Sequence, residues 1–290
     1  MKRRKILEKV VEKVLLVCAS VSVVSVLFIT FFIFQQGLPL FAKVSPLTFL
    51  FSSKWEPVGK PPSFGIFSFL VGSIYVTVGA LAFSVPVGIA CGIFLAEIAK
   101  GSISRVLKSV VELLAGIPSV IYGLFGIVFV APFVREVFGG NGFSVLSASI
   151  ILAIMTLPTI INMTEVSLRA VPHELKEGSL ALGATHWQTI SRVLIPAARS
   201  GIIAGVVLGM GRAIGETMAV LLVAGNAPLM PTGPLSMVRT LTMNIITDMS
   251  YAEGDHMTSL FTTGIVLFVF ILVLNIIVQV ILKRSIEEQV

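Results

Sequence analysis

Six long apolar runs constrain the fold of this 290-residue chain more than any other feature of its sequence. Five of the runs contain no charged residue, and the remaining one contains only Arg212 and Glu216. A helix needs about 20 apolar residues to cross a bilayer, and a backbone in lipid has to satisfy its own hydrogen bonds. We therefore predict an all-α polytopic membrane protein. The six expected transmembrane helices are about 14–34, 66–95, 113–134, 143–163, 200–225 and 257–282.

The composition excludes several other classes of protein. Hydrophobic residues make up 56% of the chain and charged residues 12%, against about 25% charged residues in ordinary soluble domains. Membrane β-strands would show alternation over about 10 residues instead of continuous runs. The first run follows a basic segment, as in a signal peptide, but its apolar core exceeds the usual 7–15 residues, so we expect an uncleaved anchor. We expect residues 1–290 to form a single permease domain.

The distribution of Lys and Arg predicts the orientation of the chain. Fifteen basic residues lie in the N-terminal segment, the second and fourth loops and the C-terminal tail, and five lie in the other loops. Because basic loops stay on the cytoplasmic side, we expect both termini to be cytoplasmic and the protein to lie in the inner membrane. The net charge of +6 mostly records this asymmetry, so it implies contact with membrane lipid and no nucleic-acid partner.

The fourth loop, residues 170–199, is long and is expected to fold. Pro172 suits the first turn of a helix and Gly183 a helix end, which predicts a short helix over 173–182. A second helical segment over 185–194 is expected to end at Pro196. Leu175 and Leu180 supply apolar contacts. The pair of helices would either anchor the loop at the membrane surface or dock on a cytoplasmic partner.

This loop resembles the E-A-A-x-x-x-G…I-x-L-P loop of the permeases of ABC importers. Glu177, Gly183 and Pro196 have the required spacing, and Gly178-Ser179 replaces the two alanines. The resemblance implies a MetI-like permease fold. It also implies that the loop carries a coupling helix that docks on a cytoplasmic ATPase, with Glu177 and Gly183 shaping the joint.

The charged residues of the fifth run need a reason, because a charge at mid-bilayer costs about 2.5–3.5 kcal/mol on insertion scales. Arg212 and Glu216 are four residues apart, so a continuous helix would place them on one face, together with a stripe of Gly201, Gly205 and Gly209. Such a stripe permits close approach of another helix. The pair would either neutralise itself as a packing salt bridge, or Arg212 would help an oxyanion to pass with Glu216 holding it in place.

The segments around these residues resemble one branch of the importer permeases. Gly211–Met218, Gly116–Gly123 and Gly92–Glu97 are similar to segments of the C-type permeases of phosphate importers. The resemblance implies a second, A-type permease subunit, a cytoplasmic ATPase dimer and an extracytoplasmic phosphate-binding protein. It also implies a role in phosphate passage for Arg212 and Glu216, with ATP bound by the partner subunit and no cofactor in this chain.

Other residues of the apolar runs are weaker candidates. Tyr122, Thr159 and Asn162 either offer hydrogen-bond donors to the path or make helix–helix contacts. Pro118 and Pro158 are expected to kink the third and fourth spans.

The sequence has no Walker-type phosphate loop, so an external motor or a passive mechanism is implied. The main hypothesis is a non-catalytic permease subunit of an ATP-driven phosphate importer. Alternatives are a permease for sulfate, molybdate or phosphonate, an ion-driven secondary transporter or channel, and a regulatory membrane scaffold.

Overall fold

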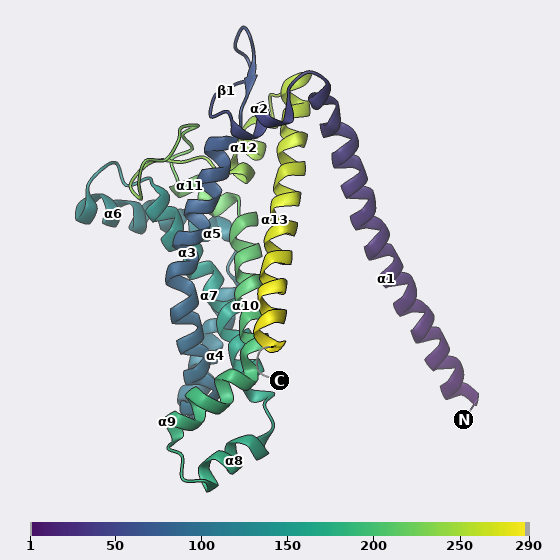
Figure 1. Cartoon of the computed structure of the whole chain (residues 1–290), viewed down its shortest axis with the longest axis vertical. Coiled ribbons are helices and arrows are strands. Elements are labelled where there is room, and N and C mark those ends of the chain that lie inside the picture. The colour runs from purple at the N-terminus through teal and green to yellow at the C-terminus, as the bar shows by residue number, and fades with distance from the viewer. Residues whose placement is uncertain (1, 288–290) are drawn as a thin grey trace.

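The computed structural model describes residues 2–287 and is mostly helical (Figure 1). The elements are α1 (Lys2–Gly37), η1 (Leu38–Ala42), α2 (Pro46–Phe51), β1 (Trp55–Glu56), β2 (Ser63–Phe64), α3 (Phe67–Ile93), η2 (Phe94–Ile98), α4 (Gly101–Gly116), α5 (Ser119–Phe125), η3 (Gly126–Val130), α6 (Ala131–Phe138), α7 (Val145–Arg169), α8 (His173–Ala181), α9 (His186–Thr189), η4 (Ile190–Leu194), α10 (Ile195–Gly215), α11 (Met218–Val223), α12 (Leu241–Asp248) and α13 (Asp255–Glu287). The segment η1 is a 3₁₀ helix, and η2, η3 and η4 are π-helical turns.

The structure confirms the predicted number of spans. Within the described residues, six helical segments are long and apolar enough to cross a membrane: Val10–Ala42, Phe67–Ile98, Ser119–Phe138, Val145–Arg169, His186–Gly215 and Asp255–Ile277. The β1–β2 hairpin and α12 lie at one end of the bundle, and α8 and α9 lie at the opposite end (Figure 1). We call these the hairpin end and the α8 end.

Helix α7 forms the centre of the bundle, packed against α3 on one side and α10 on another. Small residues allow these helices to approach closely. A Cβ at Gly88 of α3 would lie 2.7 Å from Ile160 Cγ2, and one at Gly205 of α10 would lie 2.6 Å from Met163 Cβ. The expectation that the glycines of the fifth span admit a neighbouring helix is therefore confirmed, and that neighbour is α7.

Helix α1 diverges from the rest of the bundle (Figure 1). Its contacts with α13 lie near the hairpin end, where the Phe32 and Phe261 rings meet edge to face at 5.8 Å. The Thr262 hydroxyl donates a hydrogen bond of 2.8 Å to the Gly37 carbonyl. The apolar residues between positions 10 and 29 are exposed in the single chain.

The third span is not the continuous helix expected over 113–134. Helix α4 ends at Gly116, Ile117 and Pro118 are extended, and a new helix begins at Ser119. Proline disfavours the helical conformation of the residue before it, which explains why Pro118 produces a complete break and not the predicted kink. The Tyr122 hydroxyl bridges the break by donating to the Leu114 carbonyl at 2.8 Å.

The fifth span is also broken, whereas a single helix over 200–225 was expected. Helix α10 ends at Gly215, and Glu216 is extended with φ −68° and ψ 134°. The short helix α11 follows, and its Ala219 N–H donates to Glu216 Oε1 at 3.1 Å. The Thr242 hydroxyl donates to the Glu216 carbonyl at 3.0 Å. The break is stabilised because its exposed backbone groups have partners.

Other prolines are accommodated without ending a helix. Helices α3 and α7 continue through Pro86 and Pro158. The π-helical turns η3 and η4 stand immediately before the helices that begin with Ala131-Pro132 and Ile195-Pro196. A wider turn removes the clash between the proline ring and the carbonyl of the preceding turn. The expected helix end at Pro196 is therefore wrong, because one helical segment runs from His186 to Gly215.

At the hairpin end, a buried carboxylate holds three segments together. Asp248, which is 2% exposed, accepts hydrogen bonds from Trp55 Nε1 at 3.1 Å, Arg239 Nη1 at 3.2 Å and the Tyr251 hydroxyl at 2.6 Å. His256 Nε2 lies 3.2 Å from its Oδ2. Asp248, at the end of α12, therefore has its charge compensated by donors from the hairpin, the segment between α11 and α13, and α13 itself.

Candidate functional site

The two helix breaks lie beside each other. Helix α5, which follows the first break, packs on α11, which follows the second. The contact is close, because a Cβ at Gly123 would lie 2.5 Å from Leu222 Cδ1 and 3.1 Å from Ala219 Cα. Half-buried irregular backbone at membrane depth is tolerated where it is covered by protein or lines a water-filled cavity.

Arg212 lies on the last turn of α10, just before the second break, and its side chain is exposed in the single chain. It has no ion-pair partner among the described residues. It lies within electrostatic range of Tyr122, which is 5% exposed. A Cβ at Gly211 or Gly215 would meet no atom within 4 Å, so open space surrounds this turn.

The expectation that Arg212 and Glu216 share one helix face, and the alternative that they form a salt bridge, are both wrong. The helix ends between them, and the Glu216 carboxylate instead accepts from the start of α11. The glycine stripe faces α7, whereas Arg212 is exposed. Thr159 and Asn162 are half-buried on α7, and within the described residues neither makes a side-chain hydrogen bond that links it to Arg212.

A second candidate region is the fourth loop, whose two expected helices are present as α8 and α9. The backbone of Gly183 has φ +83°, in the left-handed region. Its N–H donates to the Leu180 carbonyl at 3.0 Å, and the Ala184 N–H donates to the Ser179 carbonyl at 3.2 Å. These two bonds form a Schellman motif that ends α8. A capping box of Thr185 and Gln188 begins α9.

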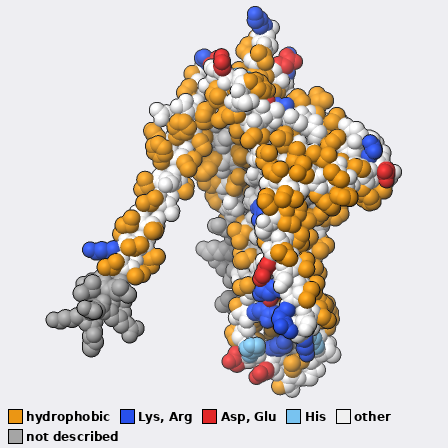
Figure 2. Space-filling model, turned by 180° about the vertical axis from the view of Figure 1, so that it is seen from behind, with side chains coloured by type: hydrophobic (Ala, Val, Ile, Leu, Met, Phe, Trp, Pro, Cys, Tyr) orange, Lys and Arg blue, Asp and Glu red, His pale blue; other side chains and the backbone are white. Residues whose placement is uncertain are grey.

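Helix α8 protrudes from the bundle (Figure 1), and none of its residues is buried. Leu175 and Leu180 are about half exposed, and Leu182 is 91% exposed. Glu177 is exposed on the same helix, and Trp187 of α9 is also exposed. Apolar side chains gathered on a protruding polar segment are typical of a protein-docking surface. Basic side chains also gather at the α8 end (Figure 2).

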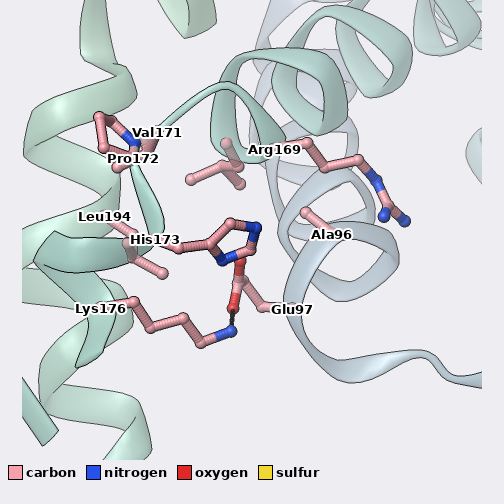
Figure 3. A pocket seen from close by; sticks show the side chains of 9 residues that line it. Ala96, Glu97, Arg169, Val171, Pro172, His173, Lys176 and Leu194 are labelled. Atoms are coloured by element: carbon pink, nitrogen blue, oxygen red, sulfur yellow. Dashed lines mark hydrogen bonds and ion pairs between the residues drawn. The ribbon is translucent and has the colours of Figure 1, made fainter.

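Ionic contacts that the sequence did not reveal hold the base of α8. Lys176 Nζ lies 2.5 Å from Glu97 Oε2 beside a cavity of about 210 Å³, into which His173 also points (Figure 3). Nearby, Glu165 is 1% exposed and pairs with both Arg169 at 2.9 Å and Lys108 at 3.3 Å. Glu97 and Glu165 each lie just beyond the end of an apolar run, and this position was the sequence feature that could have singled them out. It did not indicate which basic residues they pair with.

The family model for the "binding-protein-dependent transport system inner membrane component" matches residues 88–287. The chain belongs to this family of permeases. Among its relatives, the probable ABC transporter permease protein YqgH of Bacillus subtilis is 41% identical over 89% of this chain and 86% of that protein. The phosphate transport system permease protein PstC of Mesorhizobium japonicum is 36% identical over 82% of this chain and 78% of its own.

Solved permeases share the fold. The MetNI methionine ABC transporter in an inward-facing conformation aligns with a TM-score of 0.60 at 20% identity, covering 76% of this chain and 97% of that chain. A bacterial ABC transporter for import of the polysaccharide alginate aligns with a TM-score of 0.57 at 15% identity, covering 75% and 78%. These likenesses confirm the expected MetI-like permease fold.

Proposed function

We propose that this chain is the transmembrane permease subunit of an ATP-driven importer of inorganic phosphate. The observation that carries the proposal is the identity of 36% with a PstC phosphate permease over 82% of the chain. The sequence similarity covers the broken third and fifth spans together with the α8 loop. The chain would form one half of the path and perform no covalent chemistry itself. Its partners would be an A-type permease, a cytoplasmic ATPase dimer and an extracytoplasmic phosphate-binding protein.

We assign the path to the exposed surface around Arg212. A guanidinium stays charged at all relevant pH values and presents a planar fork that suits tetrahedral oxyanions. Its exposure and its lack of an ion-pair partner within the described residues leave the fork available to an incoming anion. Tyr122 would shape the same surface, and Glu216 would hold α11 in place through Ala219. Thr159 and Asn162 would contribute at a different stage of passage.

We assign the α8 end to the cytoplasm and α8 to the ATPase. This orientation agrees with the excess of basic residues in the loops at that end. Leu175 and Leu180 would contact the ATPase, Glu177 and Gly183 would shape the joint, and Pro196 would join it to the fifth span through η4. Closure of the ATPase would move α8, and the spans would then expose the path alternately to each side.

Uptake of labelled phosphate into proteoliposomes that contain the assembled complex tests the function. We expect uptake to require ATP, and Arg212→Ala to abolish it while the complex still assembles. Arg212→Lys keeps the charge but loses the fork, so it should restore only part of the uptake. Arg135→Ala, which removes an exposed arginine of α6, is the matched control. Unchanged uptake in Arg212→Ala would refute the assignment of the path.

Competition by sulfate, molybdate and phosphonate in the same assay distinguishes the substrate. If one of these anions inhibited uptake more strongly than unlabelled phosphate, that anion and not phosphate would be the transported substrate. Uptake without ATP in a preparation that lacks an ATPase would indicate a secondary transporter or channel instead.

A further inference from the structure

Polar side chains link helix α8 to the rest of the bundle. None of its residues is buried, and Lys176 is the residue whose charge reaches the membrane-spanning core. The Lys176 ammonium meets Glu97 of η2, the π-helical turn that ends the second span (Figure 3). A further contact joins the Ser179 and Thr189 hydroxyls at 3.0 Å.

Glu97 is suited to a strong interaction because it is sheltered from water. Its side chain is 8% exposed, whereas that of Lys176 is 30% exposed. Exposed ion pairs contribute little to stability, but removing one partner of a buried pair leaves an uncompensated charge. The pair therefore favours one position of α8 relative to the second span.

The contacts continue from η2 to α4. The Leu95 carbonyl of η2 accepts a hydrogen bond from Arg169 Nη2 at 3.0 Å. Arg169 Nε donates to Glu165 Oε1 at 2.9 Å, and Lys108 Nζ of α4 lies 3.3 Å from the same oxygen. The second Glu165 oxygen is buried and has no hydrogen-bond partner among the described residues. The buried carboxylate thus joins α7 and α4 beside the turn that holds Glu97.

Helix α4 leads from these contacts to the candidate path. It runs without interruption from Gly101 to Gly116 and ends at the first break, where Tyr122 caps its Leu114 carbonyl. The ion pairs of Glu165, the hydrogen bond from Arg169 to η2 and the Tyr122 cap thus form a continuous route from the turn that holds Glu97 to the first break. Packed elements of this kind have discrete arrangements, which is the requirement for coupling two distant sites.

We propose that Glu97 and Lys176 are positioning residues that transmit movement of α8 to the path, with Glu165 passing it to α4. The inference rests on the proposed function, because it needs α8 to be moved by an ATPase. It adds a defined route of ion pairs and hydrogen bonds between the docking helix and the break at Ile117-Pro118. The pair touches neither the anion nor the nucleotide.

A double-mutant cycle in the reconstituted complex tests this proposal. Phosphate uptake and ATP hydrolysis are measured together for the wild type, Glu97→Gln, Lys176→Gln and the double variant. We expect each single variant to keep the ATPase bound and hydrolysing, and to lower the phosphate moved per ATP by at least about fivefold, the lower end of typical coupling between sites. The double variant should resemble the single variants, because the two residues act as a unit.

Glu56→Gln is the matched control, because it also removes the acid of an ion pair, with Lys54 at 3.1 Å on the hairpin. It should leave the ratio of phosphate to ATP unchanged. Lys176→Gln keeps the test open if Glu97→Gln does not fold, since α8 has no buried residue. Wild-type ratios in the single variants, multiplying effects in the double variant, or loss of the bound ATPase would each overturn the proposal. A wild-type complex without ATP-driven uptake would instead refute the proposed function and, with it, this inference.

Discussion

The end of α8 offers a test of the docking helix with a control in the same helix. We consider Gly183→Ala, which places a side chain on a backbone with φ +83°. The new Cβ would meet no atom within 4 Å, so steric contact with the rest of the chain adds nothing. The whole cost is the left-handed conformation, about 1–2 kcal/mol for a residue with a side chain. This cost weakens the Schellman motif directly.

Gly178→Ala is expected to have the opposite effect. Gly178 lies inside α8, where the backbone is an ordinary helix, and its Cβ would also lie in open space. Alanine is favoured over glycine in a helix interior by about 0.8–1.0 kcal/mol. The two substitutions add the same methyl group to the same exposed helix, so any difference between them comes from the backbone conformation.

Hydrogen exchange of the peptide that contains residues 179–186 measures the effect. We expect Gly183→Ala to speed exchange of the Gly183 and Ala184 amides by about 5–30-fold, the factor that corresponds to 1–2 kcal/mol. Gly178→Ala should slow exchange in α8 by about fourfold. Phosphate uptake should fall in Gly183→Ala and be retained in Gly178→Ala. Equal exchange in the two variants, or slower exchange in Gly183→Ala, would refute the reasoning.

Two further predictions concern packing and pH. Gly205→Ala should lower the thermal stability of the detergent-solubilised protein, because its Cβ would lie 2.6 Å from Met163 Cβ and overpacking costs about 1–3 kcal/mol. Gly211→Ala is the control, because its Cβ would lie in open space. Equal melting temperatures of the two variants would contradict this account. The pKa of Tyr251 is raised above its ordinary value of about 10 by its hydrogen bond to Asp248, then by burial and by the charge of Asp248, against an opposing effect of Arg239. The neutral phenol is therefore stabilised by folding, and this contribution is present below about pH 10 and lost as the pH rises through the raised pKa. Tyr251→Phe should melt earlier than the wild type at neutral pH, and it should lose less stability than the wild type as the pH rises above about 10. Parallel curves of melting temperature against pH would exclude the hydrogen bond as the cause.

Composition and charge were sufficient to predict the membrane class and the six spans, and the positions of proline and glycine were sufficient to predict the two short helices of the fourth loop. The spans could be predicted because hydropathy is summed over many residues, as in the uncharged run before Glu97. The short helices could be predicted because local rules, such as glycine at a helix end, depend on a few neighbouring residues. Gly183 follows such a rule, and its positive φ and the two hydrogen bonds that Gly183 and Ala184 donate agree with the prediction.

The breaks in the third and fifth spans could not be predicted in the same way. Hydropathy is the same for a continuous helix and for two half-helices, so the run around Glu216 gave no sign of an interruption, and Pro118 predicted a kink in the third span but not a complete break. The break at Glu216 depends on Thr242, which lies 26 residues away and supplies a hydrogen bond. The partner of Glu97 was equally hidden, because Lys176 is distant in the sequence.

The hydrogen bonds at the two breaks contrast with the exposure of Arg212 beside the second break. An unsatisfied backbone group in hydrocarbon costs several kcal/mol, so each group freed by a break needs a partner. The Leu114 carbonyl and the Glu216 carbonyl receive side-chain hydroxyls from Tyr122 and Thr242. The chain thus satisfies backbone groups at both breaks from its own side chains, yet it leaves the charged Arg212 exposed. A guanidinium that faced lipid at the centre of a bilayer would cost about 2.5–3.5 kcal/mol, and Arg212 has no ion-pair partner among the described residues. We therefore expect water or a second permease subunit to cover this surface in the membrane, as the proposed path between two subunits requires.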